Sequence, residues 1–225
     1  MNVLGTFSKG VEGSISINWS ESGGENCSDR CKMKGAGCYA ETSEAMRPNI
    51  KQSGIKKRKL GPVQLANMAI VKLRMIRSPW IRFSVFGSLP MPGQAEKSKG
   101  FKKAFQNLIL ESLKTGAKLH IPAETKAKAE FYQNWVNEVA PEVVVRESCQ
   151  TESGVLASKI PNSFVVGENG DKKAEKLESA KKLIDKLRKQ GKSVVSCPAI
   201  VRNSKCGKCT ACSDSRVDTV VYLKH

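Results

Sequence analysis

Seven of the eight cysteines in this 225-residue chain fall into two groups whose spacing suits metal ligands. The first group is Cys27, Cys31 and Cys38, which form a C-x3-C-x6-C pattern in a polar stretch that contains glycines. Three thiolates in such a loop can hold one face of a [4Fe–4S] cluster and leave the fourth iron open to a small ligand. We therefore expect these three cysteines to bind a metal cluster.

The second group is Cys197, Cys206, Cys209 and Cys212, in a C-x8-C-x2-C-x2-C pattern. Four thiolates complete either a tetrahedral zinc site or a fully ligated iron–sulfur cluster. The compact C-x2-C-x2-C run favours iron–sulfur, with zinc as the alternative. Clustering in two polar loops argues against chance cysteines or isolated redox-sensing thiols. Cys149 stands outside both groups, and a lone cysteine is more often a buried small hydrophobic residue.

Basic residues are concentrated in one part of the chain, whose formal net charge is +17. Ten Lys and Arg but no Asp or Glu lie between Ala45 and Ala95. The peak of this stretch consists of Lys56, Lys57, Arg58 and Lys59, and Lys51 precedes it. Such a stretch attracts phosphate backbones, so we predict contact with a nucleic acid or another polyanion. The alternative is an ordinary solvated surface loop, and no recognition motif specifies a type of nucleic acid.

Composition and motifs exclude several classes of protein. No apolar run is long enough to span a membrane, and the first residues lack the apolar core of a signal peptide, so we expect a cytoplasmic protein without membrane contact. In that reducing compartment, cysteines are better metal ligands than disulfide partners. The sequence contains no P-loop, dinucleotide fingerprint, G-x-S-x-G or H-E-x-x-H motif, so hydrolytic and nucleotide-dependent enzymes have no support.

The elements that must position these residues alternate between strand and helix. Strands are expected at 14–19, 81–86, 118–122, 143–147, 163–166 and 193–196, followed by a closing segment at 217–223. Helices are expected at 39–47, 62–77, 101–114, 126–139 and 171–190. Residues 49–60 and 88–99 have the character of loops, and no helix is expected between the fourth and fifth strands. This alternation predicts a parallel α/β sheet, either a partial (β/α)6-type open barrel or a doubly wound sheet.

We treat residues 1–225 as a single α/β domain. Its core is expected at 13–196 with an N-terminal cysteine loop at 20–40, and a C-terminal cysteine-rich metal-binding segment at 197–225. In parallel α/β folds, chemistry is located at the carboxyl ends of the strands. Both cysteine-rich loops follow such ends, after the first and the last full strands. The sequence therefore predicts that both metal sites lie on this edge.

Three segments resemble a known protein family. They are ISINWSESGGENCSDRCKMKGAGCYAE, IRFSVFGSLP and CPAIVRNSKCGKCTACSDSRVDTVVYLKH, and they resemble the phage gene product eighty-eight family, a radical-SAM-like iron–sulfur protein family. The resemblance implies a partial barrel in which the first cysteine group holds a [4Fe–4S] cluster that S-adenosylmethionine chelates. It also implies that Gly87 and Ser88 receive the amino group of S-adenosylmethionine, and that the second cysteine group holds an auxiliary cluster. Lys126 and Ser148 follow the next strands and are the other candidate cofactor-binding residues.

Two hypotheses for the function result. The first is an iron–sulfur protein resembling radical SAM enzymes, which modifies or acts on a nucleic acid or another polyanionic substrate. The alternative is a non-enzymatic protein of phage or plasmid type, stabilised by zinc or iron–sulfur, that binds a nucleic acid or a partner protein. The two hypotheses differ in the fourth ligand of the metal centre that the first cysteine group would hold. Catalysis there is disfavoured if Cys149 or His225 occupies that position.

Overall fold

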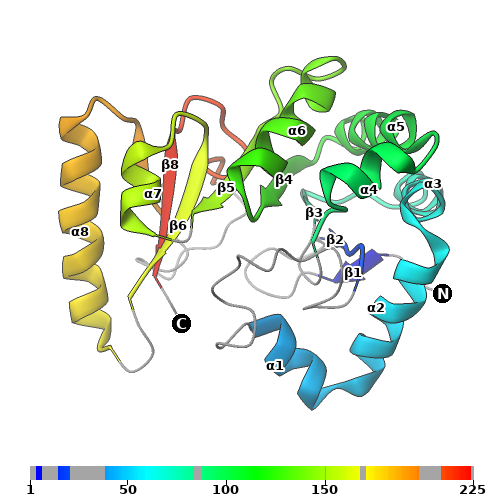
Figure 1. Ribbon diagram of the computed structural model, residues 1–225, viewed down its shortest axis with the longest axis horizontal. Coiled ribbons are helices and arrows are strands. Elements are labelled where there is room, and N and C mark those ends of the chain that lie inside the picture. Colours follow the sequence, from blue (N-terminus) through cyan, green and yellow to red (C-terminus); the bar gives the residue numbers. More distant parts are fainter. Residues whose placement is uncertain are drawn as a thin grey trace.

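The computed structural model describes residues 4–6, 15–20, 39–83, 88–149, 151–167, 171–197 and 209–223. Strands and helices alternate along most of this part of the chain (Figure 1). The strands are β1 (Leu4–Thr6), β2 (Ile15–Ile17), β3 (Trp80–Phe83), β4 (Lys118–Ala123), β5 (Val145–Cys149), β6 (Asn162–Val166), β7 (Val194–Ser196) and β8 (Thr219–Leu223). The helices are α1 (Tyr39–Met46), α2 (Pro48–Leu60), α3 (Pro62–Leu73), α4 (Pro92–Lys97), α5 (Phe101–Lys114), α6 (Lys126–Asn137), α7 (Glu152–Ala157) and α8 (Lys173–Lys189).

The strands form one open sheet in the order β1-β2-β3-β4-β5-β6-β8-β7. β1 is antiparallel to β2, and every other neighbouring pair is parallel. The seven parallel strands do not close on themselves, since β1 and β7 are the two edges of the sheet in the described residues. The prediction of an open, parallel α/β fold is therefore confirmed at this level.

The strand order decides which face of the sheet each connection covers. From β2 to β6 the chain advances one strand at a time in one direction, and the connection through α8 to β7 continues in that direction. Right-handed crossovers that advance in one direction place all their helices on the same face. β8 then returns between β6 and β7, and a right-handed return must cross the opposite face. The cysteine-rich segment between β7 and β8 makes this return.

The helix-covered face contains the hydrophobic core. Ile81, Leu119 and Val145 of the central strands point to this face and are at most 3% exposed. They pack with α3, α5 and α6, around an aromatic cluster centred on Phe105. The Phe105 ring lies 5.0 Å from the Tyr132 ring and 5.9 Å from the Phe83 ring, centroid to centroid. A second cluster joins α7 and α8 to β8 at the other end of the sheet (Figure 1).

The basic segment at 49–60 is a helix, so the prediction of a loop there was wrong. α2 begins with Pro48 at its first turn, where a missing N–H costs no hydrogen bond. It ends at Gly61, whose φ of 77° is accessible to glycine without strain. Lys57, Arg58 and Lys59 occupy its last turn, where positive charge complements the helix dipole. The segment has no amphipathic pattern, so a helix was not predicted. Its end residues stabilise the helix instead.

Three further elements were not predicted. They are β1, at the antiparallel edge, and the short helices α4 and α7. α4 and α7 have only six residues each, too few to display a helical repeat. α7 is fixed at its start by Thr151, whose hydroxyl accepts a hydrogen bond from the Gly154 amide at 3.0 Å. It supplies the crossover helix between the fourth and fifth predicted strands, where none was expected.

Candidate functional site

The face of the sheet that the helices leave open carries polar side chains from the central strands. Ser16, Arg82 and His120 are aligned across β2, β3 and β4, and their strand neighbours Ile15, Ile81 and Leu119 point into the core. Arg146 lies on the same face of β5, opposite Pro122. Ser16 is 2% exposed and His120 8% exposed, although both are polar. Burial of polar groups is costly unless they are partnered, and Ser16 accepts a hydrogen bond from Asn18 at 3.4 Å.

Arg146 fixes the return segment against the open face. Its guanidinium is fully buried and donates to carbonyl oxygens on both sides of the turn at 211–217. Nε donates to Cys212 O at 2.9 Å, and Nη1 donates to Val217 O at 2.9 Å. Nη2 donates to Ala211 O at 3.0 Å and to Asp214 O at 2.7 Å. One side chain of β5 thus satisfies four backbone acceptors of the cysteine-rich segment.

Three of the four C-terminal cysteines belong to one small cluster near this arginine. Cys197, Cys209 and Cys212 belong to one small cluster with Val220 and Tyr222 of β8. The Cys212 sulfur lies 2.9 Å from the Tyr222 hydroxyl, and Lys118 donates to the Cys209 carbonyl at 3.3 Å. Cys206 lies outside the described residues. Within the described residues, no three His, Cys, Asp or Glu side chains are grouped closely enough to hold a metal ion.

The electrostatics around Cys212 bear on whether a thiolate fits there. Burial raises the pKa of its thiol, while the hydrogen bond from Tyr222 and the charges of Arg146 and Arg82 act in the opposite direction. A bound metal displaces the thiol proton, after which the same three groups stabilise the thiolate. A centre with four thiolate ligands has net negative charge with either zinc or iron–sulfur, so two arginines suit it. The described thiols and the arginines near them are therefore chemically compatible with a thiolate-ligated metal centre.

The second cysteine group does not lie wholly at the carboxyl edge of the strands, where the sequence placed it. Cys197 directly follows β7 at that edge. Cys209 contacts Lys118, the first residue of β4, and Cys212 contacts Arg146, the second residue of β5. A connection between parallel strands must return from one edge to the other, and this one crosses the sheet face on its way. Cys209 and Cys212 therefore lie against the open face, on the side of residues near the amino ends of β4 and β5.

His120 is the buried titratable group at the centre of this face. Its Nε2 atom has no hydrogen-bond partner in the described part of the chain. Burial lowers the pKa of His120 well below its usual value, and the charges of Arg82 and Arg146 lower it further. The imidazole is therefore neutral at physiological pH, and an unpaired ring nitrogen remains available on the open face.

A second polar group lies where the carboxyl ends of β3 and β4 meet. Lys128 of α6 is fully buried and donates from Nζ to Glu124 at 2.6 Å, to the Leu89 carbonyl at 2.6 Å and to Ser88 at 3.0 Å. The Ser88 hydroxyl also donates to the Glu124 carboxylate. This group anchors the loop after β3 to the start of α6.

The predicted cofactor-binding residues are thus only partly brought together. Ser88 is in the group just described, and Ser148 is half-buried near the end of β5. Lys126 is exposed and pairs with Glu130 at 3.6 Å on the outer side of α6. Gly87 lies outside the described residues. Sequence reasoning missed Lys128, although its spacing of four from Glu124 at a helix start is a pattern for an ion pair.

The first cysteine group, Cys27, Cys31 and Cys38, and His225 also lie outside the described residues. Cys149 packs on the helix-covered face with Val155 of α7 and Leu183 of α8. Burial raises the pKa of its thiol to about 12, and the nearby Glu147 carboxylate acts in the same direction. Cys149 is a neutral core thiol that faces away from the C-terminal cysteines, as its isolated position indicated.

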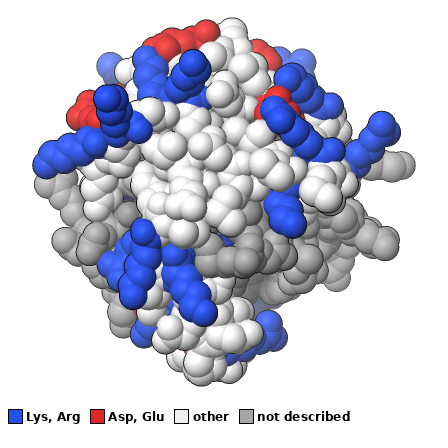
Figure 2. All heavy atoms as spheres, turned by 90° about the vertical axis from the view of Figure 1, so that its right-hand side faces the viewer, with Lys and Arg blue, Asp and Glu red and all other residues white. Residues whose placement is uncertain are grey.

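The basic stretch is only partly available to a polyanion. Lys51, Lys56 and Lys59 are exposed on α2. Lys57 is 5% exposed, and burial lowers its pKa. Arg58 is half-buried. In a helix, the four consecutive basic residues point to different sides, so they cannot all meet one phosphate backbone. Figure 2 shows Lys and Arg gathered on the face of the molecule that contains α2 and α3.

In the described part of the chain, no helix is both long and apolar enough to cross a membrane. Comparison with known proteins adds no relative: no family model, curated protein or solved structure matches this chain significantly.

Proposed function

We propose that this protein is an iron–sulfur protein resembling radical SAM enzymes, which acts on a nucleic acid or another polyanionic substrate. The observation that carries the proposal is the open face of the sheet. Arg82, His120 and Arg146 line it, and Cys197, Cys209 and Cys212 approach one another against it. In the described residues, α3, α5, α6, α7 and α8 cover one face of the parallel sheet, as the outer helices of an opened (β/α) barrel do, and the inner face of such a barrel binds cofactors and substrates.

The two cysteine groups have different roles in this proposal. Cys197, Cys206, Cys209 and Cys212 hold an auxiliary centre, and Arg146 and Lys118 fix the backbone around it. Cys27, Cys31 and Cys38 hold the cluster that binds S-adenosylmethionine, which supplies radical chemistry when it is reduced. The spacing of the C-terminal group favours iron–sulfur there, and its arginine neighbours suit the negative charge of a thiolate-ligated cluster.

A second candidate is a non-enzymatic binding protein in which metal only fixes the loops. The four hydrogen bonds from Arg146 favour it, because they make the C-terminal centre a rigid structural element rather than an exposed reactive site. In both candidates, Lys51, Lys56 and Lys59 attract the polyanion from the exposed side of α2.

Metal analysis of anaerobically purified protein tests the proposal. We expect roughly eight irons and matching sulfide per chain, with visible charge-transfer absorption that S-adenosylmethionine perturbs. Cys209→Ser with Cys212→Ser should remove about half of the iron and leave the response to S-adenosylmethionine. The matched control is Cys149→Ala, which changes a buried thiol on the other face and should keep the full iron content. A zinc-loaded, iron-free protein that binds polyanions would overturn the enzyme proposal and support the second candidate.

A further inference from the structure

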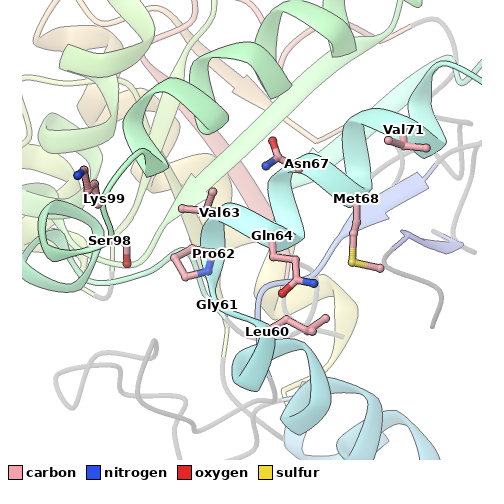
Figure 3. A pocket seen from close by; sticks show the side chains of 10 residues that line it. All are labelled: Leu60, Gly61, Pro62, Val63, Gln64, Asn67, Met68, Val71, Ser98 and Lys99. Atoms are coloured by element: carbon pink, nitrogen blue, oxygen red, sulfur yellow. The ribbon is translucent and has the colours of Figure 1, made fainter.

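An apolar groove lies along the outer side of α3. It has a volume of about 570 Å³ and extends from the α2–α3 junction at Leu60 past Met68 to Val71. Ser98 and Lys99, in the turn between α4 and α5, form its opposite wall (Figure 3). α3 therefore has a row of apolar residues beside a groove that side chains of another molecule can enter.

Exposed apolar side chains continue this line beyond the groove. Val71 is 57% exposed, Met75 73% and Ile76 39%. Contiguous exposed apolar surface of this kind marks interaction sites, and methionines adapt their shape to a partner. On α3, Gln64, Met68 and Val71 recur at the spacing of one helix face, which a second helix can pack against, and Met75 follows just beyond the helix end.

Exposed lysines lie beside the groove. Lys59, Lys72 and Lys99 are exposed beside it, and no Asp or Glu is among the described residues that line it. Figure 2 shows this face with uncharged side chains in the centre, Lys and Arg around them, and Asp and Glu in its upper half. An occupant of this groove must therefore combine an apolar side with negative charge at its margins.

We propose that this groove binds an acidic amphipathic helix of a partner protein. The groove is concave, whereas adsorption to an anionic membrane requires a protruding or flat apolar face. No aromatic ring is among the described residues that line it, so these offer nucleotide bases no stacking platform. A second copy of this chain would bring the same basic rim against itself in a symmetric dimer. The site does not depend on the metal centres.

Fluorescence anisotropy with a designed peptide tests this site. The probe is a labelled helix of about 20 residues with Leu at a spacing of three and four and Glu elsewhere. We expect it to bind the full-length protein, and a scrambled peptide of the same composition to bind at least about tenfold more weakly. Val71→Glu should weaken binding about tenfold or more, because it places a carboxylate against the acidic helix. Lys99→Glu should weaken it about threefold, and less at high salt.

The matched control is Val165→Glu, since Val165 is 50% exposed on β6, far from the groove in the sheet order. It should leave the affinity for the peptide unchanged, and the circular dichroism of all three variants should match that of the wild type. The proposal is overturned if the peptide does not bind, or if Val71→Glu and Val165→Glu bind it equally well. It is also overturned if Val71→Glu abolishes binding of single-stranded DNA or of anionic phosphatidylserine vesicles while peptide binding is retained.

Discussion

The two faces of the sheet are closed in different ways. On the helix-covered face, Ile81, Leu119 and Val145 pack under α3, α5 and α6 in a continuous apolar core. On the open face lie their neighbours Arg82, His120 and Arg146, and Arg146 holds the return segment between β7 and β8. One face is stabilised by the removal of apolar surface from water, and the other by hydrogen bonds to a loop that carries cysteines.

This difference indicates which face of the sheet can bind ligands or react. An apolar face sealed by aromatic packing leaves no group to bind or react, and its close packing tolerates no substrate. The open face holds neutral imidazole, guanidinium and thiol groups together, at a cost in desolvation that packing alone does not offset. We expect substitutions on the helix-covered face to lower stability without changing the metal content, and substitutions on the open face to lower the metal content as well.

The largest effect is expected from Phe105→Ala on the helix-covered face. Phe105 is fully buried at the centre of the aromatic cluster, so its truncation should lower the free energy of unfolding by about 4 kcal/mol. Urea denaturation measures this loss. Phe131→Ala, at the half-buried margin of the same cluster, should cost less than half as much. Metal per folded molecule should remain that of the wild type in both variants, and a loss of metal would contradict the separation of the two faces.

A smaller loss of stability, with loss of metal, is expected from Arg146→Met. The substitution leaves four carbonyls of the 211–217 turn without their buried donor and should cost about 3 kcal/mol. Metal content of the C-terminal centre should fall at the same time, as measured by elemental analysis. The control is Arg216→Met in the same segment, which removes a largely exposed pair with Asp214 and should leave the free energy of unfolding nearly unchanged. Equal stability of the two variants would refute the role assigned to Arg146.

The smallest effect is expected from the pH dependence that His120 contributes. Because burial lowers its pKa in the folded state, the unfolded chain binds a proton more readily as the pH falls below about 6.5. The contribution to stability is therefore complete above that pH and is lost as the pH decreases toward the folded-state pKa. Urea denaturation of wild type and His120→Phe between pH 8 and pH 5 measures it. The wild type should lose stability more steeply, and parallel curves would disprove a buried, neutral His120.

Most elements could be predicted because each carries a local pattern. The predicted helix at 101–114 coincides with α5, and the strands at 163–166 and 193–196 match β6 and β7 within one residue. The prediction for 49–60 was wrong because the many lysines leave no apolar face to recognise. The helix there depends on its end residues rather than on burial. The short helices α4 and α7 were not predicted, because a turn and a half is too short to show a periodic pattern.

The candidate site was predictable in chemistry but not in placement. The sequence indicated thiols as ligands and the turn after β4 as part of the site. The buried lysine that donates a hydrogen bond to Ser88, however, is Lys128, whereas Lys126 pairs with Glu130 on the surface. Two residues along a helix rotate a side chain by more than half a turn, so only the docking of α6 decides which lysine points inward.

By itself, the sequence determined the alternation of strands and helices, the acid-free basic stretch and the grouping of the cysteines. These are properties of neighbouring residues, and local patterns encode them. Tertiary structure alone decided that β8 returns between β6 and β7 and brings the last cysteines across the open face. Strand order depends on contacts between residues far apart in the chain, and the handedness of the return then fixes its side. Arg146 and His120 gain their importance from that crossing.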